Sequence, residues 1–234
     1  MPENVLPIYD RAADVVRAIY DARIDTPAIL DPAQYFPNAR RFVDAWTAIR
    51  REALQVAENL PRIPRFHDIM PAQADISAND GRDWRLYIMR AYGVSFPDKL
   101  APCPTVAGIL EDVPEAVSCS FSFIAPGKHV PRHRGPFRGI LRFHLMLSMP
   151  QDEDGKPACE LYVDDVPRRL GDGDSLLWDD TFPHELKNRS DKVRIALLLD
   201  VWRPQMPADM RFLSNAIYLG ANTMIRMGGM DYTA

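Results

Sequence analysis

Prolines interrupt this chain more often than is usual, and they restrict what it can fold into. There are 21 prolines among 234 residues, roughly 9% against a usual share of about 5%. Proline ends helices, and within sheets it is tolerated mainly at edges and bulges. A bundle of long helices is therefore excluded, and short elements separated by turns are expected.

Short runs with strand character begin after residue 82, and turns rich in Pro, Gly and Asp separate them. The expected strands are Trp84 to Met89, Val117 to Ile124, Ile140 to Met149, Cys159 to Val163, Ser175 to Trp178 and Val193 to Trp202. Short strands at this spacing predict an antiparallel sandwich or barrel.

Helical periodicity flanks these runs. Apolar residues recur at helical spacing from Ala12 to Tyr20 and between Asn38 and Leu60, and a last helix is expected from about Ala208 to Tyr218. No internal repeat or linker divides the chain. The sequence thus predicts one domain, with a helical flank at 1–82, a β core at 83–204, and a C-terminal helix and tail at 205–234.

Charge and cysteine content narrow the class of protein. Lys and Arg number 28 against 32 Asp and Glu, a formal net charge of -4, which excludes a polycation that binds nucleic acid in bulk. Cys103, Cys119 and Cys159 have no CxxC spacing and are interpreted as core residues of a reduced, cytoplasmic protein. There is no apolar run of about eighteen residues, and Met1 to Asn4 carry no basic segment, so neither a membrane span nor a signal peptide is expected.

Successive side chains of a strand point to opposite faces. In the expected strands at 117–124, 140–149 and 193–202, all polar residues therefore lie on one face of the strand, and the other face is wholly apolar. On these mixed faces lie Arg142, His144, Ser118, Ser120, Ser122, Arg194 and Asp200. A few polar groups in an apolar lining are typical of a ligand pocket. A solvated sheet face is the alternative.

Two histidines precede the strands that carry Arg142 and Arg194. His133 comes just before the strand of Arg142, and His184 just before the strand of Arg194. Two imidazoles from neighbouring strands suit a divalent metal with open positions, as in the related two-His-one-carboxylate iron sites. Surface or capping histidines are the alternative. A zinc site at the HxxxH spacing of His129 and His133 would need a helix, which the surrounding prolines disfavour.

Four ordered motifs resemble the aspartyl/asparaginyl β-hydroxylase family, which includes the lipid A 2-hydroxylases. They are HRGPFRGILRFHL at 133–145, DGDS at 172–175, WDDTFPHE at 178–185 and RIALLLDVWRP at 194–204. The resemblance covers roughly Ile29 to Pro204. It implies a mainly β chain with flanking helices, folded as a double-stranded β-helix of the jelly-roll, cupin-like kind, and dependence on Fe(II) and 2-oxoglutarate.

The resemblance also implies roles for individual residues. His133 and His184 match the family's two iron ligands. The positions that match its 2-oxoglutarate contacts are Arg194, Arg142, His144 and Ser122. A guanidinium fork suits bidentate binding of a carboxylate, and Arg194 matches the residue that binds the distal one.

Gly135 departs from a common pattern. Many 2-oxoglutarate oxygenases have Asp or Glu two residues after the first histidine, and glycine supplies no ligand. Animal-type members of the family also have glycine here and hydroxylate, whereas radical halogenases of the wider superfamily use the same deletion to admit chloride. Hydroxylation is expected, with halogenation as the alternative.

Further side chains near the motifs have two interpretations each. Arg132, Arg134 and Arg138 cluster near the expected site entrance, where they either attract an acidic substrate or solvate a loop. Asp179 and Asp180 either orient a ligand imidazole or cap a turn. The C-terminal methionines either pack in the core or cover the site mouth or an oligomer interface; these are Met206, Met210, Met224, Met227 and Met230.

The resemblance implies a dioxygenase that uses Fe(II), 2-oxoglutarate and O2 to hydroxylate an unactivated C–H bond. The expected substrate is a small soluble molecule, such as an amino acid or a natural-product intermediate, and it is acidic if the arginines bind it. A radical halogenase, a peptidyl Asp/Asn hydroxylase and a non-catalytic cupin-like binding module remain as alternatives. No oligomeric state and no role for His67 or His129 follow from the sequence.

Overall fold

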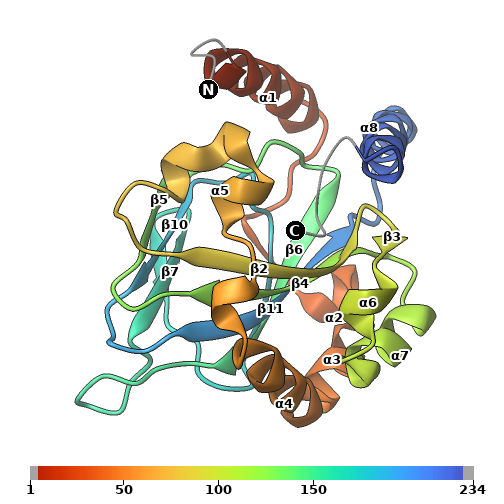
Figure 1. The fold of residues 1–234 in the computed structure, drawn as a ribbon. Helices are drawn as coiled ribbons and strands as arrows, with labels where there is room; N and C mark the ends of the chain where they lie inside the picture. The colour runs from red at the N-terminus through yellow and green to blue at the C-terminus, as the bar shows by residue number, and fades with distance from the viewer. Residues whose placement is uncertain (1–4, 229–234) are drawn as a thin grey trace.

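The computed structural model describes residues 5–228, which form two antiparallel sheets flanked by helices (Figure 1). The larger sheet has the order β1-β9-β6-β11-β4-β2-β3, and the smaller has the order β5-β10-β7-β8. The strands are β1 Ile29–Leu30, β2 Trp84–Ala91, β3 Val94–Ser95, β4 Ala116–Ile124, β5 His129–His133, β6 Ile140–Ser148, β7 Cys159–Val163, β8 Val166–Arg168, β9 Ser175–Trp178, β10 His184–Asn188 and β11 Arg194–Trp202.

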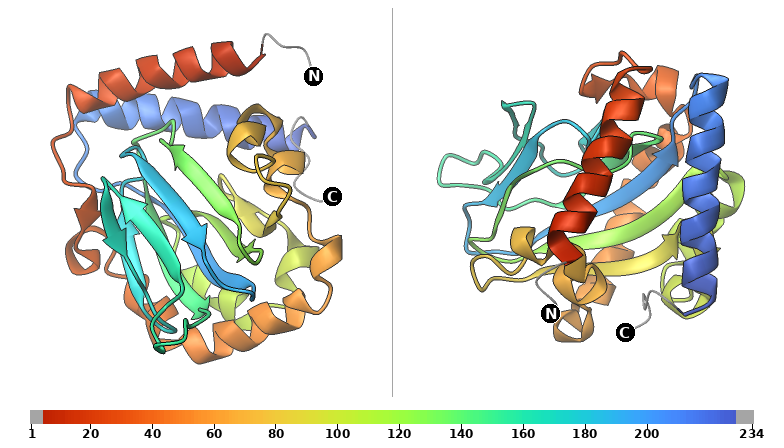
Figure 2. Two further views of the ribbon diagram at one scale, coloured as in Figure 1. Left: turned by 90° about the vertical axis from the view of Figure 1, so that its left-hand side faces the viewer. Right: turned by 90° about the horizontal axis from the view of Figure 1, so that it is seen from above.

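The helices lie on the outer face and at the ends of the larger sheet. They are α1 Val5–Asp21, α2 Pro32–Tyr35, α3 Ala39–Asp44, α4 Trp46–Ala57, α5 Phe66–Ile69, α6 Pro97–Leu100, α7 Pro104–Asp112 and α8 Ala208–Arg226, with short 3-10 turns η1 Leu60–Arg62 and η2 Pro71–Ile76. Figure 2 shows α1 and α8 running alongside each other at one end, far from α4. None of the described helices is long and apolar enough to cross a membrane.

Two apolar layers cover the two faces of the larger sheet. One layer packs it against α3, α4 and α7, and the other lies between the two sheets. The first layer includes Leu141, Phe143, Leu145 and Leu147 of β6, the face that alternation predicted to be core. The fold is a double-stranded β-helix, or jelly roll, of cupin-like type with flanking helices, and the expected fold class is confirmed.

The alternating pattern of strand β4 placed Val117 in this core, and that prediction is wrong. Val117 was expected to share a face with Cys119, but it packs in a separate cluster beside α1 and α8. The β4–β11 register shifts between Asp200 and Val201, so Ala116 rather than Val117 reaches the main core. A β-bulge reverses the faces of the residues beyond it, which the sequence pattern does not reveal.

Several elements differ from the sequence expectation, including the short strands β1, β3 and β8 and helix α7, which were not predicted. Strands β5 and β10 were not expected, because HVPRH and HELKN are polar and β5 contains a proline. β5 tolerates Pro131 because it is an edge strand of the smaller sheet. The last helix runs to Arg226 rather than Tyr218, since Gly220 does not end it. The expectations for Met1 to Asn4 and Met230 fall outside the described residues.

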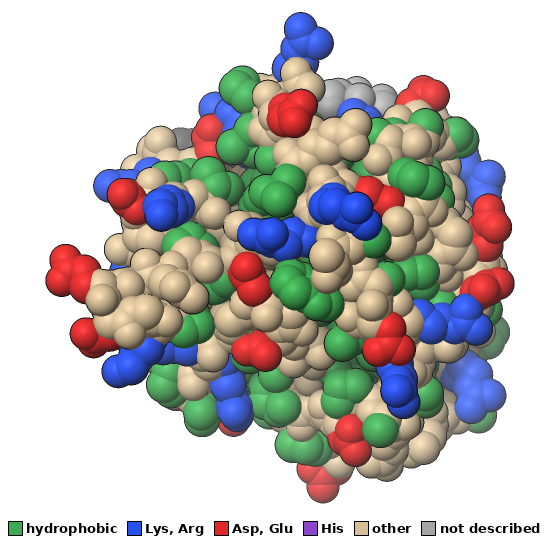
Figure 3. Space-filling view, turned by 90° about the horizontal axis from the view of Figure 1, so that it is seen from below, with side chains coloured by type: hydrophobic (Ala, Val, Ile, Leu, Met, Phe, Trp, Pro, Cys, Tyr) green, Lys and Arg blue, Asp and Glu red, His purple; other side chains and the backbone are tan. Residues whose placement is uncertain are grey.

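The three cysteines are free and buried, as expected for core residues. On the surface shown in Figure 3, Lys and Arg side chains are interspersed with Asp and Glu, and the described residues on that face form no extended patch of one sign. This agrees with the nearly balanced charge of the whole sequence. The absence of bulk nucleic-acid binding stays a prediction.

Candidate active site

His133 and His184 face each other across two neighbouring strands. His133 ends β5, His184 begins β10, and the two are register partners with ring centroids 4.0 Å apart. A register shift between His184 and Leu186 follows directly. Such irregularities commonly re-aim a side chain beside a functional site. The smaller sheet thus presents both rings at the same end.

Each ring nitrogen Nδ1 is held by the protein backbone. His133 Nδ1 lies 2.8 Å from the carbonyl oxygen of Pro131, and His184 Nδ1 lies 2.9 Å from that of Phe182. A carbonyl can only accept, so Nδ1 donates its proton and Nε2 keeps its lone pair. Both Nε2 atoms are therefore in the form that binds a metal.

Burial keeps both rings neutral. Desolvation lowers the pKa of His133. Desolvation and then the neighbouring His133 bring the pKa of His184 well below its usual value. Neutral imidazole is the ligand form that nitrogen-binding metals such as iron use. Within residues 11–228, no cluster of three or more His, Cys, Asp or Glu side chains could hold a metal, so the candidate donor set is these two histidines alone.

A small cavity of about 40 Å³ adjoins the two histidines, and all four predicted co-substrate residues line it: Arg194, His144, Ser122 and Arg142. The guanidinium of Arg194 is buried and contacts Met146 Sδ at 3.3 Å. Within the described part of the chain, its Nε and both ring nitrogens of His144 have no hydrogen-bond partner. Burial lowers the pKa of Arg194 to about 10 and that of His144 well below its usual value. Buried donors left without partners are costly unless a ligand satisfies them.

Arg142, the fourth predicted co-substrate residue, is already paired with protein carboxylates. It borders both this cavity and a larger one, and its guanidinium lies 3.0 Å from Asp200 and 3.1 Å from Asp180. Burial lowers the pKa of Arg142, but the two aspartates outweigh burial and hold it well above its usual value. Its role in binding 2-oxoglutarate stays a prediction.

The larger cavity, of about 420 Å³, also borders His133 and has mainly apolar walls. Its walls come from α1, α5, η2 and α8 and from strands β2, β4, β5, β6 and β11. The apolar residues of its lining include Val16, Phe66, Ile69, Ile76, Trp84, Leu86, Ile88, Phe137, Leu198 and Ile217. Its charged groups are Arg90, Arg142, Asp180 and Asp200. The cavity is large enough for an organic substrate next to the two histidines.

The carboxylate of Asp180 occupies the space beside Gly135. A Cβ atom at position 135 would lie 2.3 Å from Asp180 Oδ1, and the Gly135 amide already donates to the Asp180 carbonyl over 2.7 Å. Burial raises the pKa of Asp180 to about 6, although Arg142 lowers it. The contact joins residues 45 positions apart, and only the glycine itself hinted at it in the sequence.

Gly135→Ala is expected to destabilise the fold by about 1–3 kcal/mol, because the new methyl group overpacks against a buried carboxylate. Gly108→Ala in α7 is the matched control, since a Cβ there meets no atom within 4 Å and alanine favours a helix. Urea unfolding of both variants measures the difference. Equal free energies of unfolding for Gly135→Ala and Gly108→Ala would show that the Asp180 side chain can move aside without cost.

The three arginines expected at the entrance do not line the larger cavity. Arg132 pairs with exposed Asp165, and Arg134 donates to the Thr181 carbonyl oxygen. Arg138 is buried and its Nε lies 2.9 Å from Asp179 Oδ2. The interpretation of Arg138 as an entrance residue is wrong, because it is part of an internal ion cluster.

That cluster anchors the segment before His184. Asp179 is fully buried and is shared by Arg138 and Arg203, and Arg203 also donates to Thr26 Oγ1 at 2.9 Å. Asp179 additionally accepts from the backbone and hydroxyl of Thr181. Of the two sequence interpretations of Asp179, turn capping matches these contacts.

Most of the chain is similar in sequence to known hydroxylases. The family model described as aspartyl/asparaginyl beta-hydroxylase matches residues 43–204. The ornithine lipid ester-linked acyl 2-hydroxylase of Rhizobium tropici is 32% identical over 196 residues, which are 84% of this chain and 67% of that protein. The aspartyl/asparaginyl beta-hydroxylase of Homo sapiens is 27% identical over 171 residues, 71% of this chain but only 21% of the human protein.

Among solved structures, a cupin domain of an Enterobacter cloacae transcriptional regulator has 18% identity and a TM-score of 0.30, covering 36% of this chain and 80% of that one. A predicted oxalate decarboxylase from Thermotoga maritima has 10% identity and a TM-score of 0.32, covering 52% and 80%. The segment from 43 to 204 that matches the family model contains both facing histidines and Arg194. Its match confirms the resemblance read from the motifs, and this chain belongs to the aspartyl/asparaginyl beta-hydroxylase family.

Proposed function

We propose that this chain is a hydroxylase that uses Fe(II), 2-oxoglutarate and O2 to oxidise an unactivated C–H bond of an aliphatic substrate. Family membership supports a hydroxylase. The observation that carries the finer proposal is the pairing of two neutral, backbone-oriented histidines with a small cavity in which Arg194 Nε and both ring nitrogens of His144 lack hydrogen-bond partners.

The two histidines fit an iron ion by their chemistry. Both present an unprotonated Nε2, and the hydrogen bonds to Pro131 and Phe182 fix each ring's orientation. His133 and His184 would hold Fe(II), which together with 2-oxoglutarate supplies activation of O2. The protein contributes the fixed geometry and an apolar cavity that excludes water from the reacting carbon.

The donors that line the small cavity suit a carboxylate group. Arg194 would bind the distal carboxylate, with His144 beside it, and the Ser122 hydroxyl, which accepts a hydrogen bond from Trp84 Nε1 at 3.1 Å, still has its own proton to donate. A buried guanidinium with an unpaired nitrogen is otherwise unfavourable, so the site is built for an anion.

Arg194→Met is expected to raise the KM for 2-oxoglutarate by about ten- to hundredfold, because a charge-assisted hydrogen bond contributes about 1.5–3 kcal/mol. The free energy of unfolding should stay the same or rise, since the variant removes a buried charge without an ion-pair partner. Steady-state kinetics and urea unfolding give the two values. A lower stability with an unchanged KM would assign Arg194 a structural role instead.

The larger cavity favours an aliphatic substrate over the small acidic one expected from the sequence. Arg132, Arg134 and Arg138 pair with protein groups away from this cavity, and Arg142 in its wall is neutralised by two aspartates. The remaining wall is mainly apolar. The Rhizobium relative carries an acyl 2-hydroxylase name, which also supports an acyl chain as the group that is oxidised.

Asp180 supports hydroxylation over halogenation. Chloride would have to lie where residue 135 lacks a side chain, but the Asp180 carboxylate adjoins that position. A second anion there would be repelled.

The test incubates the purified chain with Fe(II), 2-oxoglutarate, O2 and a panel of fatty acids and acyl amides. Succinate production together with a product that gains one oxygen atom, detected by mass spectrometry, is expected. A product that gains chlorine would establish the halogenase instead. Failure of 2-oxoglutarate to bind the Fe(II)-loaded protein in anaerobic calorimetry would overturn the proposal.

A further inference from the structure

Helices α1 and α8 expose an unusual number of apolar side chains. Eight large apolar residues are markedly exposed in the described part of the chain, and six of them belong to these helices or to the residue after α8. The six are Val15, Ile19, Phe212, Leu219, Met224 and Met227. Phe212 is 78% exposed and Leu219 is 60% exposed. Clustered exposed apolar residues mark an interaction surface, whereas scattered ones are ordinary.

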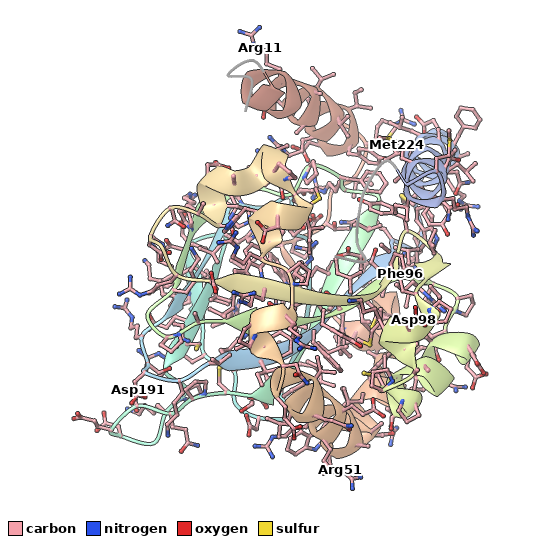
Figure 4. All side chains as sticks on the ribbon, viewed as in Figure 1. Arg11, Arg51, Phe96, Asp98, Asp191 and Met224 are labelled. Atoms are coloured by element: carbon pink, nitrogen blue, oxygen red, sulfur yellow. The ribbon has the colours of Figure 1, made fainter. Side chains whose placement is uncertain are left out.

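The same two helices form part of the wall of the larger cavity. Ala12 and Val16 of α1 and Ile217 of α8 line it, and Ala12 is itself exposed. Val15 and Ile19 lie three and seven positions beyond Ala12, so they continue its helical face toward the outside. Met224 lies seven positions beyond Ile217 on α8, where Figure 4 labels it. Val15, Ile19 and Met224 are therefore continuous with the mouth of the cavity, whereas Phe212 and Leu219, seven positions apart, share the side of α8 that faces away from Ile217.

A hydrogen bond and an ion pair hold the two helices together. Tyr20 and Ser214 share a hydrogen bond of 2.7 Å between their hydroxyls, and Arg23 pairs with Asp209 at 2.8 Å. The other end of α8 is tied to the sheet by Asn222, which donates to the Tyr92 carbonyl oxygen at 2.7 Å. The surface is thus preformed, and binding to it needs little ordering.

Arginines without acidic partners border this surface. Within the described residues, Arg11, Arg211 and Arg226 form no ion pair with a carboxylate, and Figure 4 shows Arg11 pointing outward from α1. Arginine beside an apolar helix face can bury its stem in a lipid surface and leave its charge among the headgroups. Anionic headgroups would add attraction.

We infer that the outer face of α1 and α8 docks on a lipid bilayer, so that an acyl chain can pass from the lipid surface into the larger cavity. This inference rests on the proposed aliphatic substrate. A bilayer is itself a source of acyl chains, which a second copy of the chain seated on the same residues would not be.

Vesicle flotation with the full chain tests the inference. The probes are vesicles of phosphatidylcholine alone and vesicles that also contain phosphatidylglycerol. The wild-type chain is expected to float with both, more strongly with the anionic ones. Phe212→Ser combined with Leu219→Ser is expected to weaken partitioning by about tenfold or more, since two largely exposed side chains lose their apolar contact with lipid.

Leu54→Ser is the matched control. Leu54 is the exposed leucine of α4, which lies at the opposite end from α1 and α8 (Figures 1 and 2), so its replacement should leave flotation unchanged. Binding of 2-oxoglutarate to the Fe(II)-loaded double variant should also equal that of the wild type, because neither Phe212 nor Leu219 lines a cavity.

The outcomes separate the two proposals. A wild-type chain that binds 2-oxoglutarate but floats with neither vesicle overturns docking and leaves the proposed function standing. If flotation depends on Phe212 and Leu219 but the Fe(II)-loaded chain does not bind 2-oxoglutarate, docking on lipid stands and the proposed function is overturned. A wild-type dimer that the double variant converts to a monomer in gel filtration would show that a second copy is the occupant and overturn docking on lipid.

Discussion

Replacing His133 with alanine is expected to lower the rate of 2-oxoglutarate-dependent hydroxylation by about a thousandfold or more. Loss of a residue that only orients a metal ligand lowers activity by roughly 10- to 100-fold, and loss of the ligand itself should cost more. The donor set within the described residues is only two histidines, so one imidazole would remain. Succinate formation and the stoichiometry of bound Fe(II) measure the effect.

The matched control is His129→Ala, at the other end of the same strand. His129 is half-exposed, its Nε2 lies within hydrogen-bond distance of Glu185 Oε2 at 3.0 Å, and it lines neither of the two cavities beside the facing histidines. Near wild-type activity and full Fe(II) binding are expected for this variant. Retention of iron and activity by the His133→Ala protein would contradict the assignment of the metal ligands.

Lys128→Met is expected to cost about 3–5 kcal/mol of stability, the range for removing one partner of a buried ion pair. Lys128 is fully buried, and its Nζ donates to the Ser77 carbonyl, Asn79 Oδ1 and Asp80 Oδ1, each at 2.7 Å. Loss of the ammonium removes a hydrogen bond from each of these acceptors, and Asp80 Oδ1 keeps only the one from the Arg82 amide. Urea unfolding of the purified variant measures the change.

Lys156→Met serves as the control for this change. Its ammonium is exposed and lies 4.0 Å from an equally exposed Asp154, so the stability should change by less than about 0.5 kcal/mol. A similar small change in Lys128→Met would mean that water replaces the lysine and that the segment 77–80 is not held by it.

The parts of the fold that could be predicted are those in which one residue type repeats with the period of its element. The core faces of β6 and β11 follow from strict alternation, and α8 begins at Ala208 as its apolar spacing indicated. The short strands β5 and β10 carry polar residues and pair with each other rather than with a long apolar strand. Their existence depends on pairing between distant segments, which no local pattern records.

Part of the candidate site could also be predicted from the sequence, and part could not. The family resemblance implied roles for His133, His184, His144, Ser122 and Arg194, and all five line one small cavity. The neutralisation of Arg142 by Asp180 and Asp200 could not be predicted, because these residues lie 38 and 58 positions further along the chain. The burial of Arg138 likewise depends on Asp179 and on the end of α1.

The burial of the three cysteines bears on how such a chain tolerates its own chemistry. Burial raises the pKa of Cys103 to about 12 and that of Cys159 to about 11, and it raises the pKa of Cys119 further still. Thiolates, not thiols, react readily with oxidants. A stray oxidant escaping from the cavity would meet protonated, enclosed sulfur atoms at all three positions, so self-inactivation through cysteine is disfavoured.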